Sequence, residues 1–490
     1  MFRKRNNQND AKESKTKIDT VFSIEVLKSR LVNMEDAVTV DTKTNKQVVT
    51  LLYIKTMIDH ERLNESILRP LINCSDTSFT ECIHNSEISQ IHSLEEAELQ
   101  ILSGSILLYS PIDNKCVGVH IDNPLSRAIE SSETETVLLG PKDSFSEKLE
   151  NNITLIRRRL PLTELKTESF MVGTVTKTKV VMMYIEGIAN PDLMDIARKK
   201  ISAINFDVIL DSSHVAAFME DHYNSVFPQY QQTDRPDMAA YSLAMGKLVI
   251  VVNNTPFVLI APITFFHLFQ SPDDYIQRWI VASLSRVVRY VSFVVSIILI
   301  PFYVALSTYH YQMIPLPTLY VLIESRSKLP LTPFWEALLM LITLEIIKEA
   351  SLRMPTKTGQ TLGVIGGIVI GDAAVQAGFA SKVLIVLVGI SAISSFLVPN
   401  YAMTRSNVII QFIFLVFAEF LGIVGITVGM ILLLAHLNKL SSLEQPYFAP
   451  VSPFIPRDWL DLFIRGPFRL MKKRPKFSRP LNQWRYSRRR

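Results

Sequence analysis

Two long stretches of this chain carry almost no charge, and they constrain its fold more than any other feature. No Asp, Glu, Lys or Arg occurs from Tyr290 to Ile323, and Glu419 is the only one from Val408 to Leu437. A helix of about 20 apolar residues crosses a hydrocarbon layer of roughly 30 Å, and both stretches are long enough. A helix in a soluble protein usually keeps one polar face. The sequence therefore predicts an integral membrane protein.

The half of the chain before these stretches is much more polar. It starts with three basic residues at positions 3–5, but residues 6–19 stay polar, so the apolar core of a signal peptide is missing. We therefore expect this half to stay in the cytosol. Its three cysteines, Cys74, Cys82 and Cys116, are predicted to be free thiols, because that compartment is reducing and their odd number does not suggest a disulfide framework.

Helical and strand-like patterns alternate through the polar half, which indicates an α/β region. Strands are predicted at residues 48–53, 105–109, 170–178 and 180–186, and helices at residues 94–102 and 145–159. Residues 130–141 form a polar boundary, and Asn190 followed by Pro191 begins another helix in the order that caps usually show. We therefore predict two cytosolic α/β subdomains, residues 1–130 and residues 131–270.

Two apolar runs near the end of this half, residues 249–252 and 257–260, together resemble a membrane helix. An Asn-Asn-Thr-Pro sequence separates them at residues 253–256. Such a sequence is typical of a turn, and a proline inside a membrane helix would leave a carbonyl group unpaired. We therefore predict a β-hairpin on the cytosolic face.

Residues 271–440 are predicted to form an α-helical, multi-pass membrane bundle. Ser271, Pro272 and the two acids that follow favour a helix start, and this helix would place Arg286 and Arg289 at the membrane interface. The candidate spans are residues 290–306, 334–353, 360–377, 383–398 and 408–437. We favour four crossings, with residues 334–353 the weakest candidate, because an even number keeps both termini in the cytosol.

The remaining residues, 441–490, form a basic tail. Eleven Lys or Arg residues and no acid occur between Arg465 and Arg490. A basic segment directly after a membrane span usually marks the cytosolic side and contacts anionic lipid. Nucleic-acid binding is the alternative, since aromatic residues interleave with the basic ones, but we do not favour it.

Glycines repeat every four residues around position 365 and would form a stripe without side chains on one helix face. These glycines are Gly359, Gly363, Gly367 and Gly371. Small residues at this spacing allow close packing of membrane helices. Thr361, Ile365, Ile368, Asp372 and Gln376 fall on the opposite face. An ionisable group within a span usually faces water or a partner, so this face is a candidate pore lining. An interhelical hydrogen bond or an interfacial position would explain Asp372 equally simply.

Sequence motifs for catalysis or cofactor binding are missing. The chain has neither a GxxxxGK[ST] phosphate loop nor a GxGxxG fingerprint. His214 and His222 lie among acids, but their spacing fits a solvated helix face better than a metal site. The arginines at residues 157–159 are more typical of a salt-bridged helix end than of a phosphate site. We therefore predict no catalytic residue, metal or cofactor, and no enzyme.

A resemblance to a known family rests on several motifs. The sequence Met-Pro-Thr-Lys-Thr-Gly-Gln at residues 354–360, followed by the glycine-rich residues 361–378, resembles the A subunit of spore germinant receptors. The same resemblance is carried by Gly140-Pro141 with residues 155–159, Thr178-Lys179-Val180 with residues 184–191, Asp234-Arg235-Pro236-Asp237, and Thr255-Pro256-Phe257 with residues 270–275. It extends from about Arg127 to Trp459.

The resemblance implies a subunit of the spore inner membrane that takes part in nutrient-triggered germination. It implies two partners, a transporter-like B subunit that senses small nutrients and a C subunit that is a lipoprotein. It supplies no catalytic residue. Other copies of the chain and membrane lipids are further expected partners, and nucleic acid is not.

Three functions remain open at this point. The first is an oligomeric, nutrient-gated ion path in which the isoleucines form an apolar gate. The second is a non-conducting scaffold that relays the state of its partner subunits. The third is a solute transporter, although the inverted repeats usual for transporters are missing from the sequence. Ion flux across liposomes distinguishes the first two, and substrate-dependent exchange would indicate the third.

Overall fold

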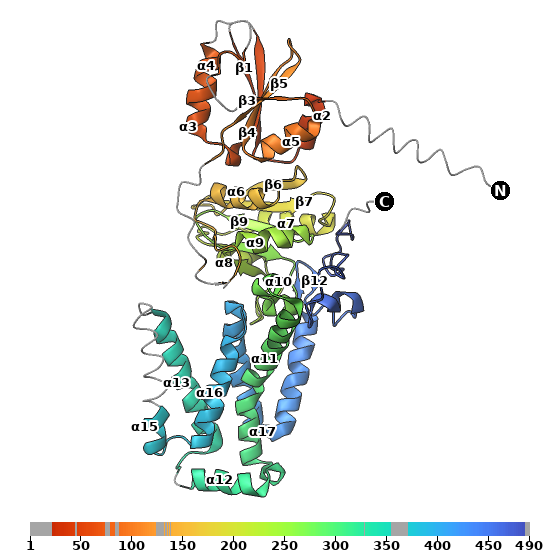
Figure 1. The fold of residues 1–490 in the computed structure, drawn as a ribbon. Coiled ribbons are helices and arrows are strands. Elements are labelled where there is room, and N and C mark those ends of the chain that lie inside the picture. The colour runs from red at the N-terminus through yellow and green to blue at the C-terminus, as the bar shows by residue number, and fades with distance from the viewer. Residues whose placement is uncertain are drawn as a thin grey trace, which may run out of the picture. The chain divides into compact units, whose positions relative to one another are not determined.

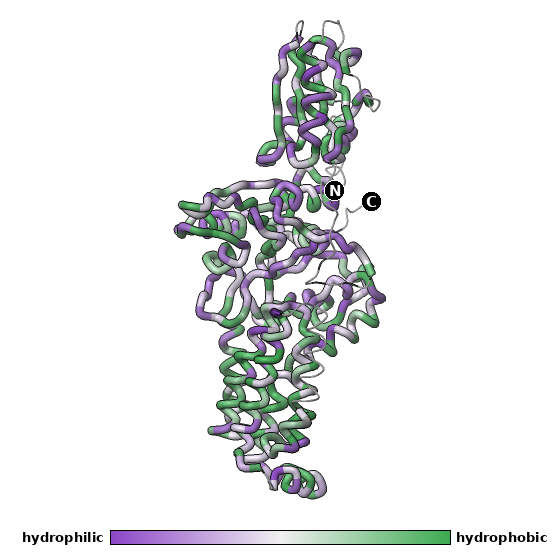
Figure 2. The backbone as a smooth tube through the Cα atoms, turned by 90° about the vertical axis from the view of Figure 1, so that its left-hand side faces the viewer, coloured by the Kyte–Doolittle hydropathy of each residue, from purple (hydrophilic) through white to green (hydrophobic). Residues whose placement is uncertain are grey.

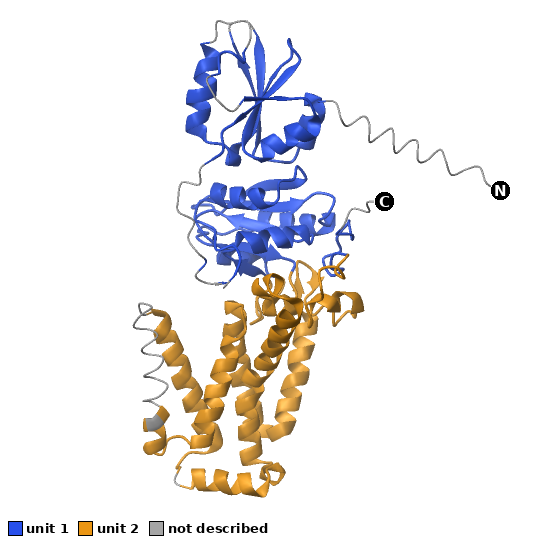
Figure 3. Ribbon diagram, in the orientation of Figure 1, with its two compact units in different colours: residues 1–220, 230–262, 473–490 blue, residues 221–229, 263–472 orange. Residues whose placement is uncertain are grey.

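The computed structural model describes residues 22–44, 47–73, 79–83, 88–123, 132, 135, 137, 139–327, 329–353 and 371–485. The chain divides into two compact units (Figure 3). Unit 1 contains residues 1–220, 230–262 and 473–490, and unit 2 contains residues 221–229 and 263–472.

Unit 1 begins with a five-stranded antiparallel sheet in the order β1-β2-β4-β5-β3 (Figure 1). Its strands are β1 (Ala37–Lys43), β2 (Val48–Ile54), β3 (Ile88–Ile91), β4 (Ser105–Ser110) and β5 (Lys115–His120). Its helices are α2 (Ile24–Arg30), η1 (Lys55–Met57), α3 (His60–Arg62), η2 (Leu63–Leu68), α4 (Arg69–Ile72) and α5 (Leu94–Leu102).

Helices cover both faces of this first sheet, which explains the apolar runs of its central strands. Leu52 and Leu107 pack with α2 and α5 in one core, whereas Leu51 and Leu108 pack with η2 and α4 in another. Successive side chains of a strand point to opposite faces. Neighbouring positions in β2 and β4 are therefore both buried, and a simple alternation of apolar and polar residues is lost.

A second antiparallel sheet follows, in the order β6-β7-β9-β10-β8. Its strands are β6 (Leu165–Val172), β7 (Thr178–Ile185), β8 (Gln231–Thr233), β9 (Leu248–Val252) and β10 (Val258–Ala261). Its helices are α6 (Leu149–Arg159), α7 (Pro191–Ser202), α8 (Ser212–Met219) and α9 (Pro236–Ala244). Helices α6 and α9 share one core with the central strands.

The hairpin and cap predicted in this region are confirmed, but one strand is shifted. Strands β9 and β10 pair directly, with Val251 opposite Val258. The Asn190 side chain caps α7 by accepting a hydrogen bond from the Asp192 amide at 3.0 Å. The strand predicted at residues 170–178 is wrong in its second half, because Gly173 has a positive φ of 86° and the chain turns there. Strand β6 instead lies earlier.

The prediction of free thiols is confirmed for one cysteine and wrong for another. Cys116 in β5 is a free thiol and is buried, and burial raises its pKa to about 12. Cys82 is disulfide-bonded. An odd number of cysteines does not exclude a disulfide, because two of the three can still form a bonded pair.

Unit 2 is mainly helical, and hydrophobic residues dominate its long helices (Figure 2). Its helices are η3 (Phe265–Phe269), α10 (Asp273–Ile276), α11 (Trp279–Thr308), η4 (Tyr311–Met313), α12 (Leu316–Arg326), α13 (Pro333–Arg353), α15 (Gly371–Gln376), α16 (Lys382–Phe396), α17 (Tyr401–Lys439) and η6 (Pro456–Asp461). A two-stranded sheet of β11 (Ser441–Ser442) and β12 (Gln445–Pro446) follows α17. Among the described residues, α11 and α17 are long and apolar enough to cross a membrane, and α12 lies crosswise to α11 (Figure 1).

The single helix predicted from Ser271 is wrong. Helix α10 is one turn long and ends where Gln277 adopts an extended conformation, with ψ of 168°. Arg278 is also extended, so α11 begins at Trp279. A tertiary contact explains the break between α10 and α11. Asp274 is buried in ion pairs with arginines of α11 and does not simply lie at a helix start.

Helix α17, predicted as one span, turns back on itself at Gly422. This glycine has a non-helical backbone, with φ 61° and ψ −137°. A straight helix would hold residues 406 and 436 about 45 Å apart. Instead the Ser406 hydroxyl donates to the Val226 carbonyl, and the His436 ring lies 3.0 Å from the hydroxyl of Ser225. Residues 401–421 and 423–439 therefore form a helical hairpin.

The chain enters and leaves the helical part of unit 2 at the same end. Before α11, the Ile263 amide donates to the Ser442 hydroxyl at 3.1 Å, and the Phe265 amide donates to the Tyr447 carbonyl at 2.8 Å. Ser442 and Tyr447 both follow α17. The two segments are therefore in contact, and this contact does not depend on how many helices lie between them.

The second part of the basic tail folds back onto unit 1. The Arg474 guanidinium donates to the Ala244 carbonyl at 2.7 Å, and the Leu481 amide donates to the Ile188 carbonyl at 3.0 Å. The ammonium group of Lys247 lies 5.6 Å from the centre of the Phe477 ring. Residues 473–485 are therefore held on the part of unit 1 that contains the second sheet, and the basic residues before them belong to unit 2.

Candidate functional site

Most of the predicted pore segment lies outside the described residues. This applies to Thr361, Ile365, Ile368, Gly359, Gly363 and Gly367, and to the side chain of Asp372. The backbone of Asp372 belongs to α15, Gly371 is buried at its start and Gln376 is exposed at its end. A Cβ atom on Gly371 would lie 3.8 Å from Ile385 of α16, which is an ordinary contact distance.

A layer of buried polar side chains joins three helices of unit 2. Ser296 lies on α11, Ser391 on α16, and Asn407 and Gln411 on the first half of α17. The Asn407 amide donates to the Ser296 hydroxyl at 2.6 Å. The Gln411 amide donates to the Ser391 hydroxyl at 2.9 Å, and that hydroxyl donates to the Ser296 carbonyl at 3.0 Å. Such bonds hold membrane helices in one register.

One atom of this layer has no hydrogen-bond partner. The side-chain oxygen of Asn407 is buried and accepts no bond among the described residues. A buried amide oxygen without a donor costs about 1–3 kcal/mol. Polar groups within apolar spans often mark functional sites, so this layer is a candidate for the part of the bundle that changes during function.

A buried ion pair lies elsewhere in the bundle. The Glu336 carboxylate of α13 is fully buried and accepts a hydrogen bond from the backbone amide of Ser381, just before α16. Its other oxygen lies 3.7 Å from the Arg326 guanidinium of α12. The Tyr303 hydroxyl of α11 lies 3.3 Å from the Ser381 hydroxyl. This cluster connects α11, α12, α13 and α16.

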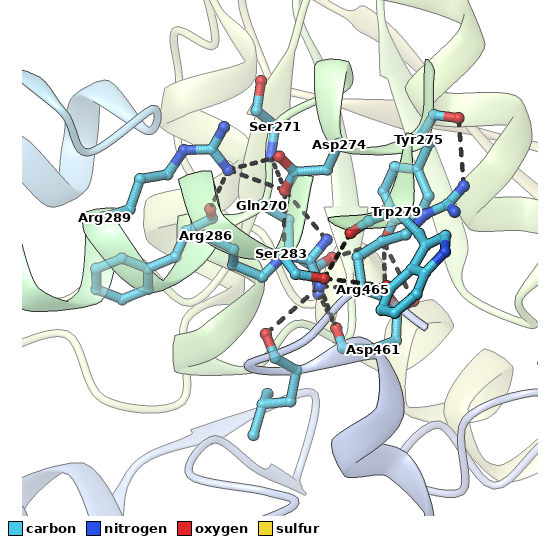
Figure 4. A network of polar contacts seen from close by, with 12 residues as sticks. Gln270, Ser271, Asp274, Tyr275, Trp279, Ser283, Arg286, Arg289, Asp461 and Arg465 are labelled. Carbon is cyan, nitrogen blue, oxygen red and sulfur yellow. Dashed lines mark hydrogen bonds and ion pairs between the residues drawn. The ribbon is translucent and has the colours of Figure 1, made fainter. Parts of the chain in front are cut away.

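Another polar network lies beside the first turns of α11 (Figure 4). Asp274 is almost fully buried and pairs with two arginines of α11, Arg286 at 3.0 Å and Arg289 at 2.8 Å. Arg286 is also fully buried and reaches the Asp461 carboxylate at 3.2 Å and its backbone carbonyl at 2.7 Å. The network thus joins α10, α11 and η6.

Further bonds extend this network along the segment after η6 (Figure 4). The Tyr275 hydroxyl donates to the Asp461 carboxylate at 3.2 Å, and the Ser283 hydroxyl donates to the Arg465 carbonyl at 3.2 Å. Arg465 is itself buried. Residues 461–465 are therefore fixed to α10 and α11 by both side-chain and backbone groups.

The sequence predicted that Arg286 and Arg289 suit the membrane interface, which stays a prediction, and it gave no sign of their ion pairs. Both guanidinium groups are engaged with Asp274 inside the protein. Asp461 was missed because it lies 175 positions from Arg286 in the chain. The sequence contains one sign of the polar layer. Asn407 and Gln411 are two amide side chains four residues apart in an apolar run.

The candidates considered in unit 1 have structural partners. Arg157 is buried and pairs with Asp36 at 2.6 Å, and Arg159 pairs with Asp143 at 2.5 Å, so the predicted salt-bridged helix end is confirmed. The ring of His214 accepts a hydrogen bond from the Leu210 amide. Among the described residues, no group of three or more His, Cys, Asp or Glu side chains could hold a metal ion.

Comparison with known proteins adds a family match. A family model described as Bacillus/Clostridium GerA spore germination protein matches residues 25–477. Spore germination protein GerQA of Bacillus cereus is 37% identical over 476 residues, which cover 96% of this chain and 95% of that protein. Spore germination protein GerIA of the same organism is 36% identical, over 95% of this chain and 71% of that protein.

The chain is also similar to a relative in Bacillus subtilis and to one solved structure. Spore germination protein KA of Bacillus subtilis strain 168 is 32% identical, over 87% of this chain and 80% of that protein. Among solved structures, the N-terminal domain of the A subunit of the Bacillus megaterium spore germinant receptor GerK3 is 27% identical, with a TM-score of 0.39. The match covers 49% of this chain and 94% of that structure.

Proposed function

Because the chain belongs to the Bacillus/Clostridium GerA spore germination protein family, we propose that it is an A-type membrane subunit of a germinant receptor and acts in triggering spore germination. The observation that carries this proposal is the family match over residues 25–477. It covers both the α/β unit and the helices that are apolar enough to cross a membrane. A nutrient signal received at one unit could therefore act on the other within a single chain.

The proposed location is the spore inner membrane, with the α/β unit and both termini in the cytosol. Two features support an even number of crossings. The chain enters and leaves the helical part of unit 2 at one end, since Ile263 bonds to Ser442. Helix α17 contributes two crossings instead of one, because it turns back at Gly422. With two crossings from α17, the number of crossings stays even when residues 334–353 are counted as a span. Helix α13 in this region is 21 residues long.

The proposed mechanism is an oligomeric, nutrient-gated ion path. Its lining would be the face with Thr361, Ile365, Ile368, Asp372 and Gln376, and its close helix contacts would be made by Gly359, Gly363, Gly367 and Gly371. The layer around Asn407 supports this proposal, because it places polar side chains and an amide oxygen without a donor among the described residues between α11, α16 and α17. The partners are a transporter-like B subunit, a lipoprotein C subunit and further copies of the chain.

Ion flux into liposomes that contain the purified full chain, with and without its partner subunits, tests this mechanism. We expect a basal leak to rise in Ile365→Ala or Ile368→Ala, because a smaller apolar side chain weakens a dewetted gate. Asp372→Asn should change the preference between ions and leave assembly intact. Gly367→Leu should prevent assembly, because it separates close-packed helices.

A non-conducting scaffold is the second candidate, and one observation favours it. The side chains of the polar layer, Asn407, Gln411, Ser296 and Ser391, bond across three helices. Such interhelical bonds fit a relay of helix position as well as an ion path. If the isoleucine variants and Asp372→Asn all match the unchanged chain in the flux assay, the scaffold is the correct function.

A further inference from the structure

A short segment after the helical hairpin exposes an unusual number of large apolar side chains. They are Phe454, Trp459, Leu460, Ile464, Phe468 and Leu470, with exposed fractions between 36% and 69%. Single exposed apolar residues are common on soluble proteins, but a contiguous group of them marks an interaction surface. The segment has only one short helix among its described residues, η6, so this exposure does not come from one face of a long amphipathic helix.

The opposite side of this segment is firmly held in unit 2. Leu462 belongs to a buried core with Phe269 and Phe293, and its carbonyl accepts a hydrogen bond from the Tyr290 hydroxyl at 3.2 Å. The Phe463 ring lies 5.1 Å from the ring of Tyr290. The apolar side chains are therefore exposed on an ordered surface and are not the result of a loose chain.

The exposed side chains continue onto the first turns of α11. Trp279, Ile280 and Leu284 are exposed there, and the Ser283 hydroxyl bonds to Arg465 between the two regions. Helix α11 has 30 residues and is therefore about 45 Å long. This exceeds a hydrocarbon layer of roughly 30 Å. If the charge-free part from Tyr290 onward fills that layer, the first turns lie at the depth of the lipid headgroups.

The exposed charges of this surface have one sign. Arg278, Arg469 and Lys472 are exposed. The acids of the same two stretches are buried or partly buried, and Asp274 and Asp461 are paired with Arg286. Aromatic residues beside basic ones are typical of the headgroup region of a membrane. Each basic side chain close to an anionic surface strengthens its attraction.

We propose that residues 454–472 and the first turns of α11 form a docking surface for the headgroups of anionic phospholipid. The proposal rests on the insertion of unit 2 into a membrane, which belongs to the proposed function. The ion-pair network around Asp274 holds this surface rigidly against α11. Anionic lipid would then contact the start of α11, a helix that is long enough to cross the membrane.

Tryptophan fluorescence in bilayers tests the proposal with the full chain. One variant keeps Trp459 and a second keeps Trp335 of α13, with the other tryptophans changed to phenylalanine. Each is reconstituted into bilayers with brominated phosphatidylglycerol or brominated phosphatidylcholine, which quench nearby tryptophans. We expect Trp459 to be quenched by both lipids, and the anionic lipid to be preferred over the zwitterionic one.

The double change Arg469→Gln with Lys472→Gln should reduce this preference by about fivefold for each charge removed. Its matched control, Lys43→Gln with Lys115→Gln, removes two exposed charges from unit 1 and should leave the preference unchanged. Equal quenching of Trp459 by both lipids would overturn the anionic specificity. Quenching of Trp335 without Trp459 means that another protein surface covers this region, which overturns the docking surface alone. If neither tryptophan is quenched, membrane insertion itself fails.

Discussion

Replacing Gly422 by alanine should destabilise the helical unit, because this residue forms the tip of the α17 hairpin. Its φ of 61° and ψ of −137° are accessible almost only to glycine. A Cβ atom would lie 2.7 Å from the Cε1 atom of His310 and 3.2 Å from the Cβ atom of Tyr309. Backbone strain contributes about 1–3 kcal/mol, and overpacking against His310 adds about 1–3 kcal/mol. If the His310 ring moves aside, the backbone strain remains.

The direction of the stability change in Gly422→Ala distinguishes the hairpin from a continuous helix. In the interior of an uninterrupted helix, a change from glycine to alanine is stabilising by about 0.5–1 kcal/mol. Unfolding of the detergent-solubilised full chain, followed by circular dichroism, measures the difference. Gly389→Ala is the matched control, since Gly389 lies within α16 and a Cβ atom there would meet nothing within 4 Å. An equally stable or more stable Gly422→Ala variant refutes the hairpin.

Three further changes test individual contacts. Asp274→Asn should destabilise unit 2 by about 3–5 kcal/mol, because it removes the buried carboxylate that Arg286 and Arg289 share and leaves Arg286 only that of Asp461; an unchanged denaturation midpoint contradicts this. Arg157→Leu should destabilise unit 1 by a similar amount through the loss of its pair with Asp36, again measured by denaturant unfolding. Burial raises the pKa of Glu135 to about 7. Because the folded pKa lies above the unfolded value of 4.5, stability should fall as pH rises from about 4.5 to 7, by roughly 1.4 kcal/mol per pH unit, and Glu135→Gln should remove this slope.

The elements that sequence predicted well depend on local chemistry. The helix at Leu94–Leu102 has the predicted bounds, and its first turn is capped by Ser93, whose hydroxyl accepts from the Glu96 amide at 3.2 Å. The Asn190 cap and the β9–β10 hairpin are likewise encoded within a few residues. A cap or a turn needs only its own neighbours, so the sequence around it is sufficient.

The features that sequence could not predict depend on distant contacts. Gly422 is one of several glycines in an apolar run, and nothing local distinguishes it from Gly425 or Gly429 as a turning point. Its conformation is fixed by the packing of both halves of α17 against α11, which share one core. The partner of Arg286 in η6 was hidden for the same reason, since 175 residues separate them. The candidate pore residues from Thr361 to Ile368 remain a sequence-based proposal.

The path of α17 across the membrane is tested most directly by labelling single cysteines from one side of sealed vesicles. Tyr401→Cys, Leu421→Cys and Lys439→Cys place one thiol at each end and one at the tip, in a chain without its native cysteines, and all three positions are exposed. With a membrane-impermeant maleimide, we expect residues 401 and 439 to react from the same face and residue 421 from the opposite face. Labelling of residues 401 and 439 from opposite faces would contradict the hairpin and the even number of crossings.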